Sequence, residues 1–173
     1  MKKWLAIAAA IGSVTACGGG SSSPTAPTAP PANIAGPYNA NIIASSTCAA
    51  NLPLETRSLG FVATVTQTGA TVQVQLVAKA PGTPSVTLSG TVSGQTVNFP
   101  SFSFGQTMGN GAALAASGSA SAGANGTITG TLSGTYQTSS GASCNAANHQ
   151  LEMVKLCEQK FDQGVALVPC AGI

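Results

Sequence analysis

The stretch Thr71-Val72-Gln73-Val74-Gln75-Leu76 decides the fold, because apolar and polar residues alternate along it without interruption. Side chains of a β-strand point alternately to its two faces, so this pattern gives one dry face and one wet face. Residues 59–67 are also typical of a strand, and Thr68-Gly69 supplies a turn between the two segments. Together they predict an antiparallel hairpin near the middle of the chain.

The pattern continues on both sides of this hairpin. Residues 38–42 alternate upstream, residues 86–92 alternate downstream, and Ser93-Gly94 then turns the chain into residues 96–99. Pro100 cannot donate a hydrogen bond to a β-ladder, so it marks an edge or a bulge. Successive strands joined by short connections predict a meander.

Further strands and loops follow the same rules. Residues 112–122 are a weak, alanine-rich strand and residues 126–136 a strong one, while residues 45–57, 81–84 and 105–111 are predicted loops. No convincing amphipathic helix interrupts this series, so the chain is predicted to be all-β.

Residues 150–156 allow two interpretations. Leu151, Val154 and Cys157 have a spacing compatible with a helix, whereas Leu151 and Met153 suit a strand. We favour a strand that pairs with the first strand and closes the sheet. A disulfide-pinned tail over residues 157–170 would follow it.

Seven or eight antiparallel strands need their edges protected, and closure into a barrel removes the edges. We therefore predict a single small antiparallel meander β-barrel of about eight strands, with an Ig-like β-sandwich as the alternative. Residues 36–156 resemble the small lipocalin-like and avidin-like barrels, in which a Gly-x-aromatic strand such as Gly36-Pro37-Tyr38 often comes first. The few aromatic residues argue against a transmembrane barrel, which needs two aromatic girdles.

One short segment occurs twice. Ser89-Gly90-Thr91-Val92-Ser93-Gly94 is echoed by Thr129-Gly130-Thr131-Leu132-Ser133-Gly134. The echo fits a duplicated hairpin or two strands that need glycine in order to coil tightly, and we favour the second.

Four cysteines remain in the domain once the N-terminal one is set aside: Cys48, Cys144, Cys157 and Cys170. An even number in an exported domain indicates two disulfides, for which three pairings are open. We expect Cys48–Cys144 and Cys157–Cys170, since the first would tie the end of the first strand to the approach of the last. A zinc site is disfavoured, because no Cys-x-x-Cys pair is present and His149 has no obvious partners.

Residues 1–16 have the three parts of a secretory signal. Two lysines precede an apolar run over residues 4–11, and small residues follow before a cleavage point. The apolar run is shorter than the about 20 residues that a membrane-spanning helix needs. The segment is therefore predicted to be cleaved.

The run Val14-Thr15-Ala16-Cys17 at its end resembles the lipobox of bacterial lipoproteins. This resemblance implies that Cys17 receives a diacylglycerol on its sulfur, becomes the new N-terminus and is usually acylated again, for example with palmitate. Two or three acyl chains anchor a protein stably. By the same family analogy, Gly18 favours the outer membrane, on a face that the sequence leaves open.

Three segments follow from these signals. Residues 1–16 are the signal peptide, residues 17–33 are the lipidated cysteine with a linker, and residues 34–173 are the barrel domain. The Gly/Ser/Thr/Pro composition of residues 18–31, without charge or aromatic residues, predicts a disordered tether.

Charge excludes one class of function. Lys2 and Lys3 are two of the six basic residues, and the other four balance the four acidic ones, so the formal charge of +2 belongs to the signal. Between residues 58 and 150 the only charged residue is Lys79. Nucleic-acid binding needs a basic patch, which this domain lacks.

The carboxylates argue against catalysis. Besides Glu55 they are Glu152, Glu158 and Asp162, which fall in one short C-terminal stretch rather than in two convergent positions. No Gly-x-Ser-x-Gly nucleophile elbow is present. His149 beside Glu152 is interpreted as a solvated pair. We predict a protein that is not an enzyme and needs no cofactor.

Binding is the remaining class. An eight-stranded barrel is just wide enough to be packed solid or to hold one small ligand. Tyr38, Phe61, Phe99 and Tyr136 are the candidate lining of a pocket for a small neutral hydrophobic ligand, and they suit a packed core equally well. The alternatives are a structural or interaction protein of the cell envelope and, third, a periplasmic enzyme inhibitor like the lipobox lysozyme inhibitors.

Overall fold

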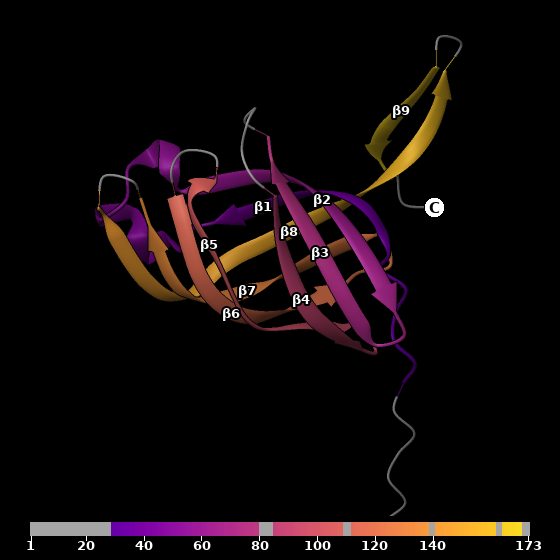
Figure 1. The fold of residues 1–173 in the computed structure, drawn as a ribbon, viewed down its shortest axis with the longest axis horizontal. Coiled ribbons are helices and arrows are strands. Elements are labelled where there is room, and N and C mark those ends of the chain that lie inside the picture. Colours follow the sequence, from indigo (N-terminus) through magenta and orange to yellow (C-terminus); the bar gives the residue numbers. More distant parts are fainter. Residues whose placement is uncertain (1–28, 80–84, 109–111, 139–140, 162–163, 171–173) are drawn as a thin grey trace, which may run out of the picture.

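The computed structural model describes residues 29–79, 85–108, 112–138, 141–161 and 164–170. In these ranges the chain is all-β apart from two short 3₁₀ helices, and eight strands close into an antiparallel barrel with a ninth strand outside it (Figure 1). The predicted signal peptide, the lipobox and most of the tether lie outside the described residues.

The barrel strands follow one another in chain order around the wall. They are β1 (Gly36–Ile43), β2 (Ser58–Thr68), β3 (Thr71–Ala78), β4 (Ser85–Ser93), β5 (Thr96–Met108), β6 (Ala112–Ala122), β7 (Thr127–Gln137) and β8 (Ser143–Phe161). Strand β8 pairs with β1, for example Leu151 with Ile42, which closes the sheet. The predicted meander barrel is confirmed, and so is the strand interpretation of residues 150–156.

Alternation along each strand separates a dry interior from a wet exterior. In β3 the residues Val72, Val74 and Leu76 are buried, and the glutamines between them are exposed. The largest fully buried side chains are Tyr38, Tyr136, Phe61, Ile42, Leu76, Leu114, Leu132, Met153, His149, Val65 and Val72. One continuous apolar core therefore fills the barrel, while serine, threonine and glutamine predominate outside it.

Strand β5 differs from the prediction. The predicted loop over residues 105–111 is wrong for residues 105–108, which belong to β5, and Met108 still pairs with Ala112. Pro100 is accommodated by a register shift between Phe99 and Phe102, as a bulge requires. The register shifts between the pairs Phe104–Leu114 and Met108–Ala112, so residues 105–107 form an irregularity within the strand and pairing with β6 resumes at Met108. Residues 109–111 lie outside the described part.

One end of the barrel is covered by the connection between β1 and β2, and we call it the capped end. This connection, predicted as a loop, contains the 3₁₀ helices η1 (Ser46–Ala50) and η2 (Leu54–Thr56). The Cys48–Cys144 disulfide joins η1 to the start of β8 across 96 residues of sequence. The expected pairing is confirmed, because the closed barrel brings the end of β1 beside the start of β8.

At the opposite end, β8 runs beyond the barrel and folds back through β9 (Gly164–Pro169) as a projecting hairpin (Figure 1). The Cys157–Cys170 disulfide closes this hairpin, so the second expected pairing is also confirmed. The predicted tail is thus a second, two-stranded sheet. Val165 and Leu167 on β9 are 59% and 52% exposed, so no core covers them.

The N-terminal segment joins the barrel at this same end, which we call the tether end. The Gln67 side chain on β2 accepts a hydrogen bond from the Ile34 N–H at 2.9 Å and donates one to the Ala32 carbonyl at 2.9 Å. The Ala32 N–H donates to the Gly94 carbonyl in the β4–β5 turn at 2.7 Å. Residues 32–34 are therefore fixed to the barrel, and the chain before them leaves from the tether end.

Candidate functional site

The four residues proposed to line a ligand pocket are all part of the packed core. Tyr38, Phe61, Phe99 and Tyr136 are each at most 2% exposed. They do not converge on one space, because Tyr38 lies at the tether end and Tyr136 at the capped end. Of the two cavities described below, one touches Phe99 and the other Tyr38, and neither touches Phe61 or Tyr136.

Both tyrosine hydroxyls are already used within the protein. The Tyr38 hydroxyl donates to the Ile34 carbonyl at 2.8 Å, and the Tyr136 hydroxyl donates to the Thr56 carbonyl in η2. Burial raises the pKa of Tyr38 to about 12 and raises the pKa of Tyr136 further. These hydroxyls stay protonated at neutral pH and hold the barrel ends, so neither is available to orient a ligand.

His149 is not the solvated residue that its neighbour Glu152 suggested. It is fully buried on the interior side of β8, and its Nδ1 accepts a hydrogen bond from the Ser45 N–H at 3.0 Å. Since Nδ1 is an acceptor, Nε2 carries the proton and donates to the Gly134 carbonyl at 3.0 Å. The sequence interpretation was wrong because the capped end folds over this part of β8.

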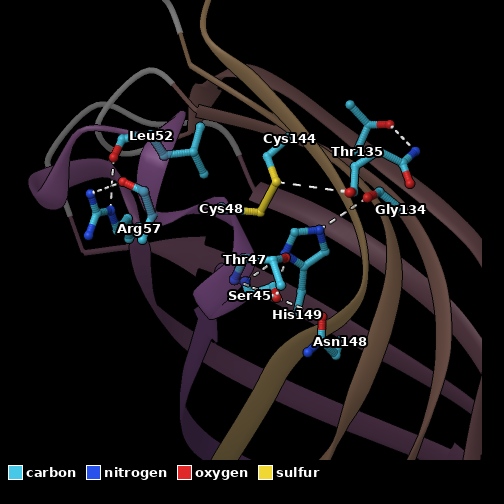
Figure 2. Close-up of a disulfide and its surroundings, with 12 residues drawn as sticks. Ser45, Thr47, Cys48, Leu52, Arg57, Gly134, Thr135, Cys144, Asn148 and His149 are labelled. Atoms are coloured by element: carbon cyan, nitrogen blue, oxygen red, sulfur yellow. Dashed lines mark hydrogen bonds between the residues drawn. A yellow bond between two sulfur atoms is a disulfide. The ribbon is translucent and has the colours of Figure 1, made fainter.

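These bonds belong to a network beside the Cys48–Cys144 disulfide, seen in Figure 2. The Ser45 hydroxyl donates to the Asn148 side chain at 2.6 Å and also accepts from the Thr47 N–H. Arg57 donates to the carbonyls of Leu52 and Ala49, so this cation also supports the cap. Both ring nitrogens of His149 have partners, which leaves no basic nitrogen free for catalysis. The capped end is therefore built for stability.

The larger described cavity, about 740 Å³, lies on the outside of the barrel across strands β4 to β8, and we call it the outer groove. On β4 and β5 it is lined by Ser89, Thr91 and Asn98, and on β6 by Ser117 and Ser119. These side chains point outward, because the residues between them face the core. The groove crosses the strands instead of running along one of them.

Further outward-facing lining residues come from β7, β8 and the bulge, and the inward positions Gly90, Phe99 and Gly118 also border the groove. Thr131 and Ser133 lie on β7, Ala147 on β8, and Pro100 at the bulge of β5. Every described residue of the lining is uncharged. The groove can therefore exchange hydrogen bonds with a ligand but cannot neutralise a charge.

Inward glycines set the curvature beneath the outer groove. A Cβ atom on Gly90 would lie 2.5 Å from the Asn98 carbonyl oxygen, and one on Gly118 would lie 2.2 Å from the Thr131 carbonyl oxygen. Contacts this short are not sterically allowed, so only glycine permits the neighbouring strands to approach so closely. Gly130 in the second copy of the repeated segment is equally constrained, because a Cβ atom there would lie 2.2 Å from the Ser119 carbonyl oxygen. Tight coiling is thereby supported as the reason for the repeat.

The sheet is also thinly paired at one edge of the groove. Strands β4 and β5 share the register pairs Thr91–Asn98, Val92–Val97 and Ser93–Thr96, and their described pairing stops there. Pro100, which has no N–H, follows directly. Ser89 therefore lies beyond the last described pair of β4 with β5.

The smaller described cavity, about 450 Å³, lies at the tether end. Lys155 projects into it from β8, with its Nζ atom 5.9 Å from the centre of the Tyr38 ring. The alkyl chain of Lys155 packs beside Gly36 and Gly126. The long Lys155 side chain covers the end of the core, and this packing role accounts for the lysine without a bound ligand.

The outer groove was not predicted from the sequence, although the sequence contains a signal for it. The triplets Ser89-Gly90-Thr91 and Ser117-Gly118-Ser119 share a hydroxyl–glycine–hydroxyl pattern, in which the hydroxyls face out and the glycine faces in. The position of one triplet beside the other depends on strand register. That register becomes known only from the fold.

Comparison with protein-family models, with curated proteins and with solved structures finds no match. Among the described residues, no group of three or more His, Cys, Asp or Glu side chains could hold a metal ion. The same part of the chain contains no helix long and apolar enough to cross a membrane. The geometry of the residues themselves is therefore the basis for assigning a function.

Proposed function

We propose that this chain is a lipid-anchored protein of the bacterial outer membrane and that its barrel is a solid scaffold which binds a partner on its outer surface. The observation that carries this proposal is the contrast between a filled interior and an outward-facing groove. A carrier of small molecules needs the opposite arrangement, with an internal cavity that surrounds the ligand.

The position of the N-terminal segment is compatible with the anchor. The chain leaves the barrel at the tether end, where residues 32–34 are fixed by Gln67. The fifteen residues from Cys17 to Pro31 would span at most about 50 Å when fully extended. The barrel would therefore be linked to the bilayer through its tether end, and the outer groove on the side of the barrel would stay accessible.

The described carboxylates and His149 support a role without catalysis. Glu55 lies in η2, while Glu152 and Glu158 are exposed residues of β8. His149 is enclosed by the capped end. A general acid–base pair needs two groups that converge on one substrate position, and these residues do not provide one.

The carrier hypothesis and the enzyme-inhibitor hypothesis, both drawn from the sequence, stay predictions. Binding of a small hydrophobic ligand inside the barrel would require Tyr38, Phe61, Phe99 and Tyr136 to move apart, against the packing that they have here. Inhibition of a periplasmic enzyme is testable with a direct lysozyme assay. Loss of lysozyme activity at stoichiometric concentrations of the protein would replace the proposed function.

Native mass spectrometry tests the solid barrel. The chain of residues 18–173, secreted to an oxidising compartment, retains every described contact and lacks only the signal and the lipidated cysteine. We expect the bare mass less four hydrogens for the two disulfides. A reproducible additional mass that is released only on unfolding would restore the carrier hypothesis and overturn the solid scaffold.

The anchor has a separate test. In the full chain, Cys17→Ser removes the residue that would be acylated, whereas Ser21→Ala in the tether is a matched control. We expect metabolic labelling with an alkyne-tagged fatty acid in the unchanged chain and in the control, and none in Cys17→Ser. Equal labelling of all three proteins would refute lipidation at Cys17.

A further inference from the structure

The lining of the outer groove indicates the class of ligand that fits it. Each serine or threonine hydroxyl can both donate and accept a hydrogen bond, and the Asn98 amide also does both. A ligand rich in hydroxyl and amide groups matches such a surface at many points. Phosphates and carboxylates lack a cationic partner among the described lining residues.

We propose that the outer groove binds a neutral oligosaccharide strand. This assignment rests on the proposed function and adds the class of ligand to it. The hydroxyls of Ser89, Ser119 and Thr131 would bond to sugar hydroxyls. Pro100 and Ala147 would supply small apolar surfaces for the C–H faces of the sugar rings. An uncharged oligosaccharide would be bound by hydrogen bonds to its hydroxyls together with small apolar contacts to its rings.

The shape of the groove supports an elongated ligand. Its lining comes from five successive strands, β4 to β8, so it spans four inter-strand spacings. At about 4.8 Å each, these amount to roughly 19 Å across the barrel wall, which is enough for several linked sugar units.

The same lining disfavours an added peptide strand. A peptide that extended the sheet would lie in its plane, beside β4 or β5 where their pairing stops. Such a peptide would not meet Ser117 of β6, Thr131 of β7 or Ala147 of β8, which also border the cavity. The space lies over the outward side chains, so its occupant recognises side chains rather than backbone edges.

The groove is preformed, which lowers the cost of binding. Its side chains are short and stand on strands whose backbone is already ordered by pairing. Gly118 cannot be replaced without a clash, and this fixes the separation of the hydroxyls on β6 and β7. Binding would therefore order little of the protein.

Amide chemical shifts of the chain of residues 18–173 provide the test, with chitohexaose and maltohexaose as neutral probes. We expect shifts confined to residues 89–91, 98–99, 117–119, 131–133 and 147. The cross-strand pair Ser119 and Thr131 is changed to Ser119→Ala with Thr131→Ala. Loss of two hydrogen bonds should weaken binding about tenfold.

A matched control uses an exposed cross-strand pair on another part of the wall. Thr66 and Gln73 face each other on β2 and β3, and Thr66→Ala with Gln73→Ala should leave the affinity unchanged. Thermal unfolding verifies that both double variants are folded. Shifts outside the groove, equal weakening by both pairs or no shift with either hexasaccharide would overturn the oligosaccharide assignment.

Photo-crosslinking separates failure of the ligand class from failure of the proposed function. Ser121, the next outward-facing residue of β6 beyond the groove lining, is replaced by benzoylphenylalanine in the full chain, which is irradiated in a bacterial host that processes lipoproteins. Crosslinks to saccharide support the assignment. Crosslinks to one protein overturn the oligosaccharide but keep an outward binding surface, and the absence of any crosslink overturns both.

Discussion

The two ends of the barrel have the same components but use them differently. Each end has one buried tyrosine that donates to a backbone carbonyl, and each has one disulfide. At the capped end the buried Cys48–Cys144 disulfide joins η1 to the start of β8. At the tether end the Cys157–Cys170 disulfide lies in a hairpin outside the barrel. A crosslink contributes to stability only where other contacts already order the segment that it closes.

The largest expected effect is therefore at the capped end. Cys48→Ala with Cys144→Ala opens a loop with a sequence separation of 96. The chain-entropy model assigns about 4–5 kcal/mol to a loop of this size, so the free energy of unfolding should fall by about that amount. Urea unfolding followed by far-ultraviolet circular dichroism measures it. A loss below about 1 kcal/mol would show that the cap is not part of the cooperative unit.

The histidine at the capped end gives the next largest effect. His149→Ala removes a buried ring and leaves the Ser45 N–H without the Nδ1 acceptor. A lost partner and a new cavity together cost about 2–4 kcal/mol. The exposed neighbour provides the control, since Gln150→Ala should change the free energy of unfolding by less than about 0.5 kcal/mol. Equal values for the two variants would contradict a structural role for His149.

Which features of the two ends could be predicted from the sequence depended on how far apart in the chain the interacting residues lie. Period-two alternation in stretches such as residues 71–76 was enough to predict the strands and the meander, because it arises from each strand alone. Closure by β8 and the Cys48–Cys144 pairing followed from the need to remove sheet edges. The burial of His149 did not follow, since Ser45 is distant in sequence and its position depends on the fold of the cap.

The outer groove had to be missed for a related reason. Ser119 and Thr131 become neighbours only in one register of β6 with β7, and a slip by one residue would place them on opposite faces of the sheet. Gly118 could be recognised as permissive, but its clash with the Thr131 carbonyl depends on how closely the two strands pack. Local patterns thus predicted which residues face out, without predicting which of them lie together.

Alkaline titration compares the two tyrosines directly, because the chain has no others. For Tyr38 the unfolded phenol ionises near pH 10 and the folded one near pH 12. The folded state therefore retains its proton longer, and stability is complete below pH 10 and falls as the pH rises to 12. The rise of the Tyr38 pKa from 10.0 to about 12 corresponds to about 3 kcal/mol.

Phenolate absorbance and urea unfolding at several alkaline pH values measure this effect. Tyr38→Phe should remove its share of the alkaline loss, and Tyr136→Phe should remove the share from the capped end. In the folded protein Tyr38 should ionise before Tyr136, whose pKa burial raises further. Ionisation of both phenols near pH 10, before unfolding, would contradict their burial.

The smallest effect is expected at the hairpin of the tether end. Cys157→Ala with Cys170→Ala opens a loop with a sequence separation of 13, for which the chain-entropy model alone gives about 3 kcal/mol. Besides the crosslink, β9 is held by its pairing with β8, and Val165 and Leu167 add no buried core. An isolated two-stranded hairpin is only marginally stable in water, so without the crosslink it should fray in the folded protein as well. Removing the crosslink then raises the conformational entropy of the folded state as well as that of the unfolded state, and the two effects largely cancel in the free energy of unfolding. The free energy of global unfolding should change by less than about 1 kcal/mol, while hydrogen exchange of the β9 amides should become fast. A loss near the full value with β9 still protected would instead place the hairpin within the cooperative core and remove the difference between the two ends.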